Sequence, residues 1–246
     1  MRDTTDTSWC DATFNPWVSC SNISSRGFSG DAQFGAASQN PHAMHKRTSE
    51  ANWRTPSRWN TQHVDFFARF GRRRRVFCAP LADAFDNDVD PYWRVELWAL
   101  IRCTPQLDWL LLTRHMNNVG NMLPPDWERG YRNVGLGLSA VDQAGIDRDG
   151  PTLLATPANR HWLSLASLPS SVSLTNIMAA SQSAHRIGGG LANIDWVVCG
   201  DASEPRAPAM PADTVDRLRK QCAAANVPFL FTQWKGNSKQ CRERAR

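Results

Sequence analysis

Short apolar runs alternate with longer amphipathic stretches along most of the chain. Runs of this kind, several of them apolar on both faces, are typical of buried strands in a parallel sheet. Six of them are predicted as strands, at 74–80, 107–113, 132–138, 159–165, 194–200 and 227–234. The stretch SWCDATF at 8–14 is expected to add one more strand at the start of the chain.

Three of the intervening stretches show helical spacing, at 91–103, 142–156 and 211–225. In the first of them Trp93, Leu97 and Ile101 share one face, as expected of a helix that covers a sheet. The second is expected to be helical only in part, with an interruption at Gly150-Pro151.

The alternation of strands and helices favours right-handed βαβ units and a parallel sheet. The predicted fold class is therefore α/β, a parallel (β/α) barrel or partial barrel of about six to seven strands. An open doubly wound sheet is the alternative.

One domain over residues 1–246 is expected, with two stretches that break the rhythm. Residues 19–60 are rich in Ser, Gly, Asn and Arg and are predicted to be an irregular loop segment. Long segments of this kind in a compact domain are usually functional or disordered. Residues 168–193 contain three consecutive glycines, at 188–190, and are interpreted as a surface insertion.

The composition of the 246 residues is that of an ordinary globular protein, 41% hydrophobic and 21% charged. No apolar run approaches the roughly 18 residues that a membrane-spanning helix needs. The first ten residues, MRDTTDTSWC, are polar and lack the apolar core of a signal peptide. A cytoplasmic location without a membrane partner is therefore expected, and the seven cysteines are expected to be free thiols.

Positive charge exceeds negative charge, with a formal net charge of +5. It is dense in the run from Arg72 to Arg75 and in the terminal stretch KQCRERAR. Both stretches are interpreted as solvated surface, with phosphate contacts as the alternative. The charge is compatible with a nucleic-acid or protein partner, and the sequence does not indicate an oligomeric state.

Ligands of parallel α/β proteins bind at the carboxyl ends of the strands. The candidate binding residues at those ends are Arg114, Ser139, Ser164, Gly200, Asp201, Gln233 and Trp234. His115 follows Arg114 and is the histidine best placed to meet a ligand. Four aspartates between 83 and 90 resemble a calcium loop, but the glycine and the bidentate glutamate are missing, so helix N-capping is the preferred interpretation.

Eight stretches of the chain carry a resemblance to a known family. They are WCDATFNPWVSC, SEANWRTPSRWN, RRRVFCAPLADAFDNDV, TPQLDWLLLTRHMNNV, NVGLGLSAVDQ, PTLLATPANRHWLSL, IDWVVCG and CAAANVPFLFTQW. In this order they resemble the phage and prophage three-cysteine-motif family, which is radical-SAM-like and of uncertain reaction. The resemblance covers most of the chain and implies a [4Fe–4S] cluster and S-adenosylmethionine as the family's cofactors.

The resemblance also implies where the cluster cysteines should stand, in the pattern C-x6-C-x2-C. Cys20 aligns with the first of them, whereas Gly27 and Gly30 stand at the other two positions. Because a cubane cluster is held by thiolates and glycine has no donor atom, Cys20 is at most a remnant ligand. The chain therefore resembles a degenerate member, and no cofactor is expected.

Acidic residues of the family are also replaced, by Val141, Ala166 and Ala202. These losses fall at predicted strand ends, which favours a chain that has lost the cluster and its catalysis. It would be retained as a binding or regulatory scaffold or as a decaying prophage product. The alternatives are an active radical-SAM enzyme acting on nucleic acid or on a small phage-pathway metabolite, and a basic nucleic-acid-binding module. The sequence leaves open whether the protein is an enzyme.

Overall fold

A computed structural model describes residues 9–19, 45–175, 177, 190–200 and 210–232. Its strands are β1 (Ala12–Phe14), β2 (Trp17–Ser19), β3 (His45–Arg47), β4 (Arg74–Cys78), β5 (Leu107–Thr113), β6 (Val134–Ala140), β7 (Arg160–Ala166), β8 (Trp196–Gly200) and β9 (Phe229–Phe231). Seven of them form one sheet in the order β1-β4-β5-β6-β7-β8-β9, and β2 pairs with β3. Since β1 and β9 stand at the two ends, the order is open. The predicted α/β class is confirmed in its partial-barrel form.

The helices are α1 (Glu50–Trp53), α2 (Thr55–Thr61), α3 (His63–Phe70), α4 (Pro91–Cys103), α5 (Met116–Met122), α6 (Gln143–Ala155) and α7 (Ala212–Ala224), with a 3-10 turn, η2, at Gly190–Asn193. The chain divides into two compact units, with the boundary inside β6, between Gly135 and Leu136. The prediction of one domain over 1–246 is not tested by this division.

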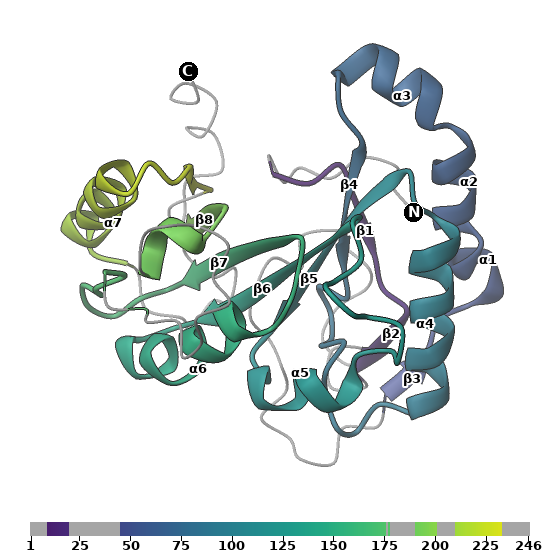
Figure 1. The fold of residues 1–246 in the computed structure, drawn as a ribbon, viewed down its shortest axis with the longest axis horizontal. Coiled ribbons are helices and arrows are strands. Elements are labelled where there is room, and N and C mark those ends of the chain that lie inside the picture. The colour runs from purple at the N-terminus through teal and green to yellow at the C-terminus, as the bar shows by residue number, and fades with distance from the viewer. Residues whose placement is uncertain (1–8, 20–44, 176, 178–189, 201–209, 233–246) are drawn as a thin grey trace. The chain divides into compact units, whose positions relative to one another are not determined.

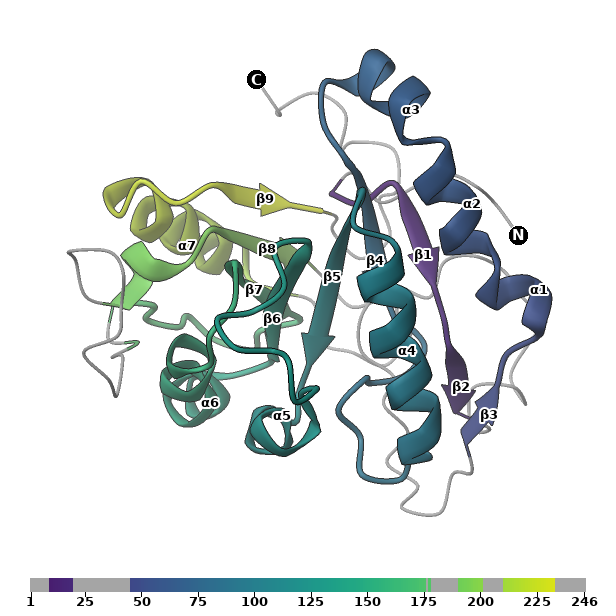
Figure 2. The ribbon, with the colours of Figure 1, turned by 45° about the vertical axis from the view of Figure 1, so that its right-hand side comes forward.

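In the first unit, β1, β4 and β5 pair in parallel. Val76 of β4 lies opposite Ala12 on one side and Trp109 on the other. These strands bury nearly all of their apolar side chains; the rings of Phe14 and Trp109 meet edge to face with centroids 5.7 Å apart. Helix α4 lies beside β4 and β5 in Figure 2. Burial of such side chains is the main favourable term in forming the sheet.

Residues 45–61 correct the prediction of an irregular segment over 19–60, since they form β3, α1 and α2. Parallel neighbours such as β1 and β4 require a crossover, and α1 to α3 supply it. The composition of these residues does not indicate helices, because few of them are apolar. Trp53, Pro56 and Trp59 are buried together with the polar Thr55, while the residues between them are exposed. Residues 20–44 lie outside the described residues.

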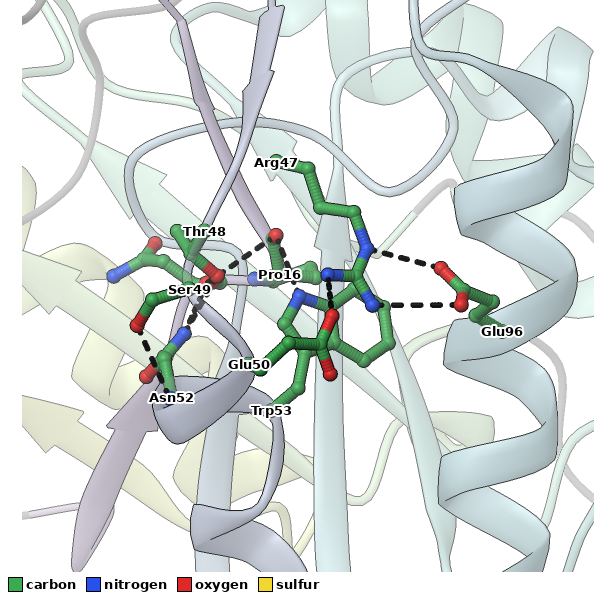
Figure 3. A network of polar contacts seen from close by, with 9 residues as sticks. Pro16, Arg47, Thr48, Ser49, Glu50, Asn52, Trp53 and Glu96 are labelled. Carbon is green, nitrogen blue, oxygen red and sulfur yellow. Dashed lines mark hydrogen bonds and ion pairs between the residues drawn. The ribbon is translucent and has the colours of Figure 1, made fainter.

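Polar contacts hold the start of this crossover against the carboxyl end of β1 (Figure 3). The Thr48 hydroxyl donates to the carbonyl oxygens of Asn15 and Pro16 at 2.8 and 2.9 Å. The Trp53 indole also donates to Pro16, at 3.2 Å, and its ring lies 4.3 Å below the Arg47 guanidinium. Arg47 in turn donates to Glu96 of α4 at 3.0 Å. The described residues of the crossover, from 45 onward, therefore begin next to the carboxyl end of β1.

In the second unit, β7, β8 and β9 pair in parallel, with Trp162 opposite Trp196 and Val197 opposite Phe229. The two indoles are stacked with centroids 5.5 Å apart. Helix α7 buries Val215, Leu218 and Cys222 and lies beside β9, as Figures 1 and 2 both show.

The predicted interruption of the helix at Gly150-Pro151 is wrong, because α6 runs unbroken from Gln143 to Ala155. Asp142 caps its first turn through a 2.7 Å hydrogen bond from the Gly145 amide. Gly150 allows Ile177 to approach closely: a Cβ at position 150 would lie 2.9 Å from its Cγ2 atom. Packing therefore outweighs the local preference of the Gly-Pro pair.

The described part of 168–193 also differs from the predicted surface insertion. Leu168, Val172, Leu174 and Leu191 are all buried. Gln221 of α7 clamps the backbone: its side chain accepts from the Leu174 amide at 2.7 Å and donates to the Val172 carbonyl at 2.9 Å. These residues extend the core of the second unit; residues 176 and 178–189 lie outside the described residues.

Candidate functional site

An aspartate lies buried where β4 and β5 end in the first unit. Asp83 is 8% exposed, and its carboxylate accepts from the Phe85 amide at 2.9 Å, the Thr113 hydroxyl at 2.8 Å and the Arg114 amide at 3.0 Å. A buried carboxylate needs this number of donors, because its charge is costly to remove from water. The side chain is thereby held in one position at the carboxyl end of β5.

His115 lies directly against this carboxylate. Its Nδ1 atom is 3.2 Å from Oδ2 of Asp83, at ion-pair distance although without the alignment of a hydrogen bond, and 41% of its side chain is exposed. The contact with Asp83 raises the pKa of His115, and burial opposes this only in part. The pair therefore favours an imidazolium that keeps one edge open to solvent.

A second histidine–aspartate pair is formed with the same β4–α4 loop. Nε2 of His45 lies 3.4 Å from the Asp86 carboxylate, and the His45 side chain is 6% exposed. Among the described residues its Nδ1 atom has no hydrogen-bond partner. The negative charge of Asp86 also raises the pKa of His115, so the two pairs influence one another electrostatically.

Arg94 fixes the loop that carries both aspartates. Its guanidinium, on a residue 7% exposed, donates to the carbonyl oxygens of Ala84 at 2.9 Å and Asp86 at 2.7 Å. Burial lowers the pKa of Arg94, while the charges of Asp86 and Asp83 oppose that effect. The loop is thus tied to α4 by charge-assisted hydrogen bonds, which are stronger than neutral ones.

The backbone is strained at the start of this loop. Ala79, directly after β4, has φ of 57°, and its amide donates to the Phe14 carbonyl at 2.8 Å. The side chain of Asn15 accepts from the Leu81 amide at 3.0 Å and joins the ends of β1 and β4. A non-glycine residue in the left-handed region is a feature that clusters at functional sites.

The predicted candidates fall into three groups. Arg114 belongs to the site just described, is half-buried, and its positive charge lowers the pKa of the adjacent His115. Ser139, Ser164 and Gly200 lie at the carboxyl ends of β6, β7 and β8 in the second unit. The remaining candidates lie outside the described residues: Cys20, Gly27, Gly30, Asp201, Gln233 and Trp234.

The candidates of the second unit offer little polar surface. Ser164 is buried, at 2% exposed, whereas Ser139 is half-buried. Gly200 uses its carbonyl to accept from the Ser167 amide at 3.1 Å, and Ser167 has a φ of 48° directly after β7. Among the described strand ends, those of β4 and β5 in the first unit carry the Asp83–His115 pair.

A model of a protein family matches residues 4–246, which is nearly the whole chain. The family is described as a protein of unknown function (DUF5131). The chain belongs to this family. No curated protein and no solved structure matches the chain. Since the description of DUF5131 names no reaction, the phage and radical-SAM relations remain what the resemblance implies.

The described cysteines form no disulfide with one another: Cys10, Cys78, Cys103, Cys199 and Cys222. All of them except Cys103 are buried. Burial, reinforced by the charge of Asp83, raises the pKa of Cys78 well above its ordinary value, which disfavours the thiolate that metals require. Within the described ranges no three His, Cys, Asp or Glu side chains are grouped so that they could hold a metal ion.

Sequence reasoning missed three members of the site: Asp83, Arg94 and His45. Capping of α4 is confirmed only for Asp90, which accepts from the Tyr92 amide at 2.9 Å. The Asp83 carboxylate instead accepts hydrogen bonds from Thr113 and Arg114 at the end of β5. Arg94 lies on the buried face of α4, which the sequence analysis predicts from its apolar residues alone.

No helix in the described part of this DUF5131 chain is both long and apolar enough to span a membrane.

Proposed function

We propose that this chain is a ligand-binding or regulatory scaffold that has lost an ancestral cluster chemistry. The scaffold holds an anionic ligand at His115 and Arg114. The observation that carries it is the Asp83–His115 contact of 3.2 Å, because it raises the pKa of a half-exposed imidazole and so favours its cationic form beside a second positive charge. Paired cations at a fixed strand end suit phosphate or carboxylate groups.

The cluster part of the proposal rests on donor atoms. Under the resemblance, Gly27 and Gly30 stand where two cluster ligands would be, and Cys78 is buried with a raised pKa. One thiolate at a matching position does not hold a cubane. Binding without cluster chemistry is therefore the function that these residues support best, and an active radical-SAM enzyme is the outcome that would overturn it.

Titration with inorganic phosphate, followed by NMR of the histidine side chains, tests the ligand site. The His115 signal, assigned with a His115→Gln variant, should shift in a saturable manner near pH 6.5. Arg114→Ala should weaken phosphate binding roughly tenfold, as expected for loss of one charge-assisted hydrogen bond.

Arg102→Ala provides the matched control. Arg102 is an exposed arginine of α4 that pairs with Asp126 at 2.8 Å, apart from the Asp83 site. Its loss should leave the phosphate affinity unchanged. An unsaturable His115 shift, or equal weakening in the Arg102 variant, would show that the response is only general charge attraction and would refute the proposed site.

A further inference from the structure

Helix α3 exposes three large apolar side chains to solvent. Val64, Phe67 and Phe70 are 65%, 55% and 47% exposed. Their spacing of three residues places them along one side of the helix. Phe66, which is 9% exposed, faces the unit, and its ring centroid lies 4.5 Å from that of Phe70. Isolated exposed apolar residues are ordinary, but two neighbouring phenylalanines on so short a helix form a patch.

Arginines surround these rings because α3 turns directly into β4. Gly71 ends the helix with φ of 66°, and its amide donates to the Phe67 carbonyl at 2.8 Å. The turn brings Arg72 back toward α3, with its guanidinium carbon 5.9 Å from the ring centroids of Phe66 and Phe70. Arg69 reaches the Phe70 ring at 5.2 Å.

The charges of this region are only partly neutralised. Arg72 donates to both carboxylate oxygens of Asp11. The Arg73 side chain is 43% exposed and lies 3.9 Å from Asp108. Arg69 lies on the exposed side of α3. The patch therefore combines accessible aromatic faces with guanidinium groups already placed beside them.

We propose that this α3 surface, formed by Val64, Phe67, Arg69, Phe70 and Arg73, binds single-stranded nucleic acid. Bases would stack on Phe67 and Phe70, and phosphates would meet Arg69 and Arg73. Stacking on aromatic rings within a basic surface is the general means of binding single strands without sequence preference.

The chemistry favours a nucleic acid over other occupants. Three apolar side chains cover far less than the roughly 20–30 residues per partner of a stable protein interface. Charge complementarity points to a polyanion, because release of its counterions adds affinity to each arginine contact. The surface precedes β4 and so lies at the amino ends of the strands, away from the site at Asp83. It therefore stands independently of the proposed anion site.

Fluorescence anisotropy of a labelled oligothymidylate of about a dozen nucleotides tests the proposal with the full chain. Phe67→Ala should weaken binding roughly tenfold, and Phe67→Tyr should retain it, because tyrosine keeps a ring for stacking. Arg69→Ala and Arg73→Ala should weaken binding and each reduce its salt dependence. The ring at position 67 is exposed, so its removal should leave the circular dichroism spectrum and the melting temperature unchanged.

Val95→Ala is the matched control, since Val95 is 62% exposed on α4. It should bind the oligonucleotide as the unmodified protein does. Equal binding by the Phe67→Ala variant would overturn the proposal, because the basic stretch KQCRERAR at the end of the chain would then explain any affinity. Phe67-dependent binding to anionic lipid vesicles, or Phe67-dependent dimerisation, without binding to the oligonucleotide would also overturn it.

Discussion

At the scale of single residues, Asp83 organises the first unit. Its carboxylate collects donors from the loop after β4 and from the end of β5, so one side chain fixes two backbone segments and one histidine. His115 could be singled out from the sequence because it follows a strand end. Asp83 could not, since several aspartates of the same loop are equivalent in the sequence and only the tertiary structure separates them.

The raised pKa of His115 gives a direct prediction. Asp83→Asn should lower the pKa of His115 toward its ordinary value, because the largest cause of the shift is the contact with Asp83. Histidine side-chain NMR over a pH series measures this. Asp88→Asn, in the same loop and exposed, is the control and should leave the pKa of His115 nearly unchanged.

The same shift links stability to pH. The folded pKa lies above the ordinary value of 6.5, so the Asp83–His115 pair stabilises the folded protein fully below about pH 6.5. That contribution is lost as the pH rises through the folded pKa. Urea unfolding across this range should show the dependence in the unmodified protein and a weaker one in Asp83→Asn. An identical dependence in both proteins would contradict the assignment.

At the scale of elements, the strands could be predicted and several connections could not. Buried parallel strands are apolar on both faces, so runs such as LDWLLLT can be recognised as strands from the sequence. The crossover helices at 50–61 are short and polar, and tertiary contacts to Asn15 and Pro16 hold their start. Gly150-Pro151 was predicted as an interruption from local preference, whereas the packing of Ile177 against Gly150 is not visible in the sequence.

The packing of β6 on β7 makes Gly137 a sensitive position. A Cβ at this glycine would lie 2.3 Å from the Trp162 ring, which is itself fully buried and stacked on Trp196. Gly137→Ala should therefore lower the free energy of unfolding by about 1–3 kcal/mol, the usual cost of overpacking. Urea denaturation monitored by tryptophan fluorescence measures the change.

Gly120→Ala is its matched control. Gly120 lies within α5, and a Cβ there would meet nothing within 4 Å. Alanine should raise the free energy of unfolding by about 0.5–1 kcal/mol, because it restricts the unfolded chain and favours the helix. Equal destabilisation by the two substitutions would contradict the packing described for Gly137.

At the scale of the whole molecule, the fold class follows from the order of strands and helices, while the function does not. Asp83, Arg114 and His115 follow the ends of β4 and β5, and His45 of β3 and Arg94 of α4 contact the same loop. The exposed cations of this group suit anion binding. Positions that the resemblance links to acids hold Val141, which is 46% exposed, and Ala166, which is buried. Neither side chain can bind or move a proton. These two positions therefore cannot take part in the chemistry that the resemblance implies, although the scaffold around them is retained.

Anaerobic iron–sulfide reconstitution, followed by iron counting, tests the central claim most directly. We expect far fewer than the roughly four irons per chain of a cubane, because Cys20 alone stands at a matching position. The double substitution Gly27→Cys and Gly30→Cys should raise iron uptake without creating turnover, since the acids replaced by Val141, Ala166 and Ala202 would still be missing. A stoichiometric cluster in the unmodified protein, with reductive cleavage of S-adenosylmethionine, would contradict the account and identify an active enzyme.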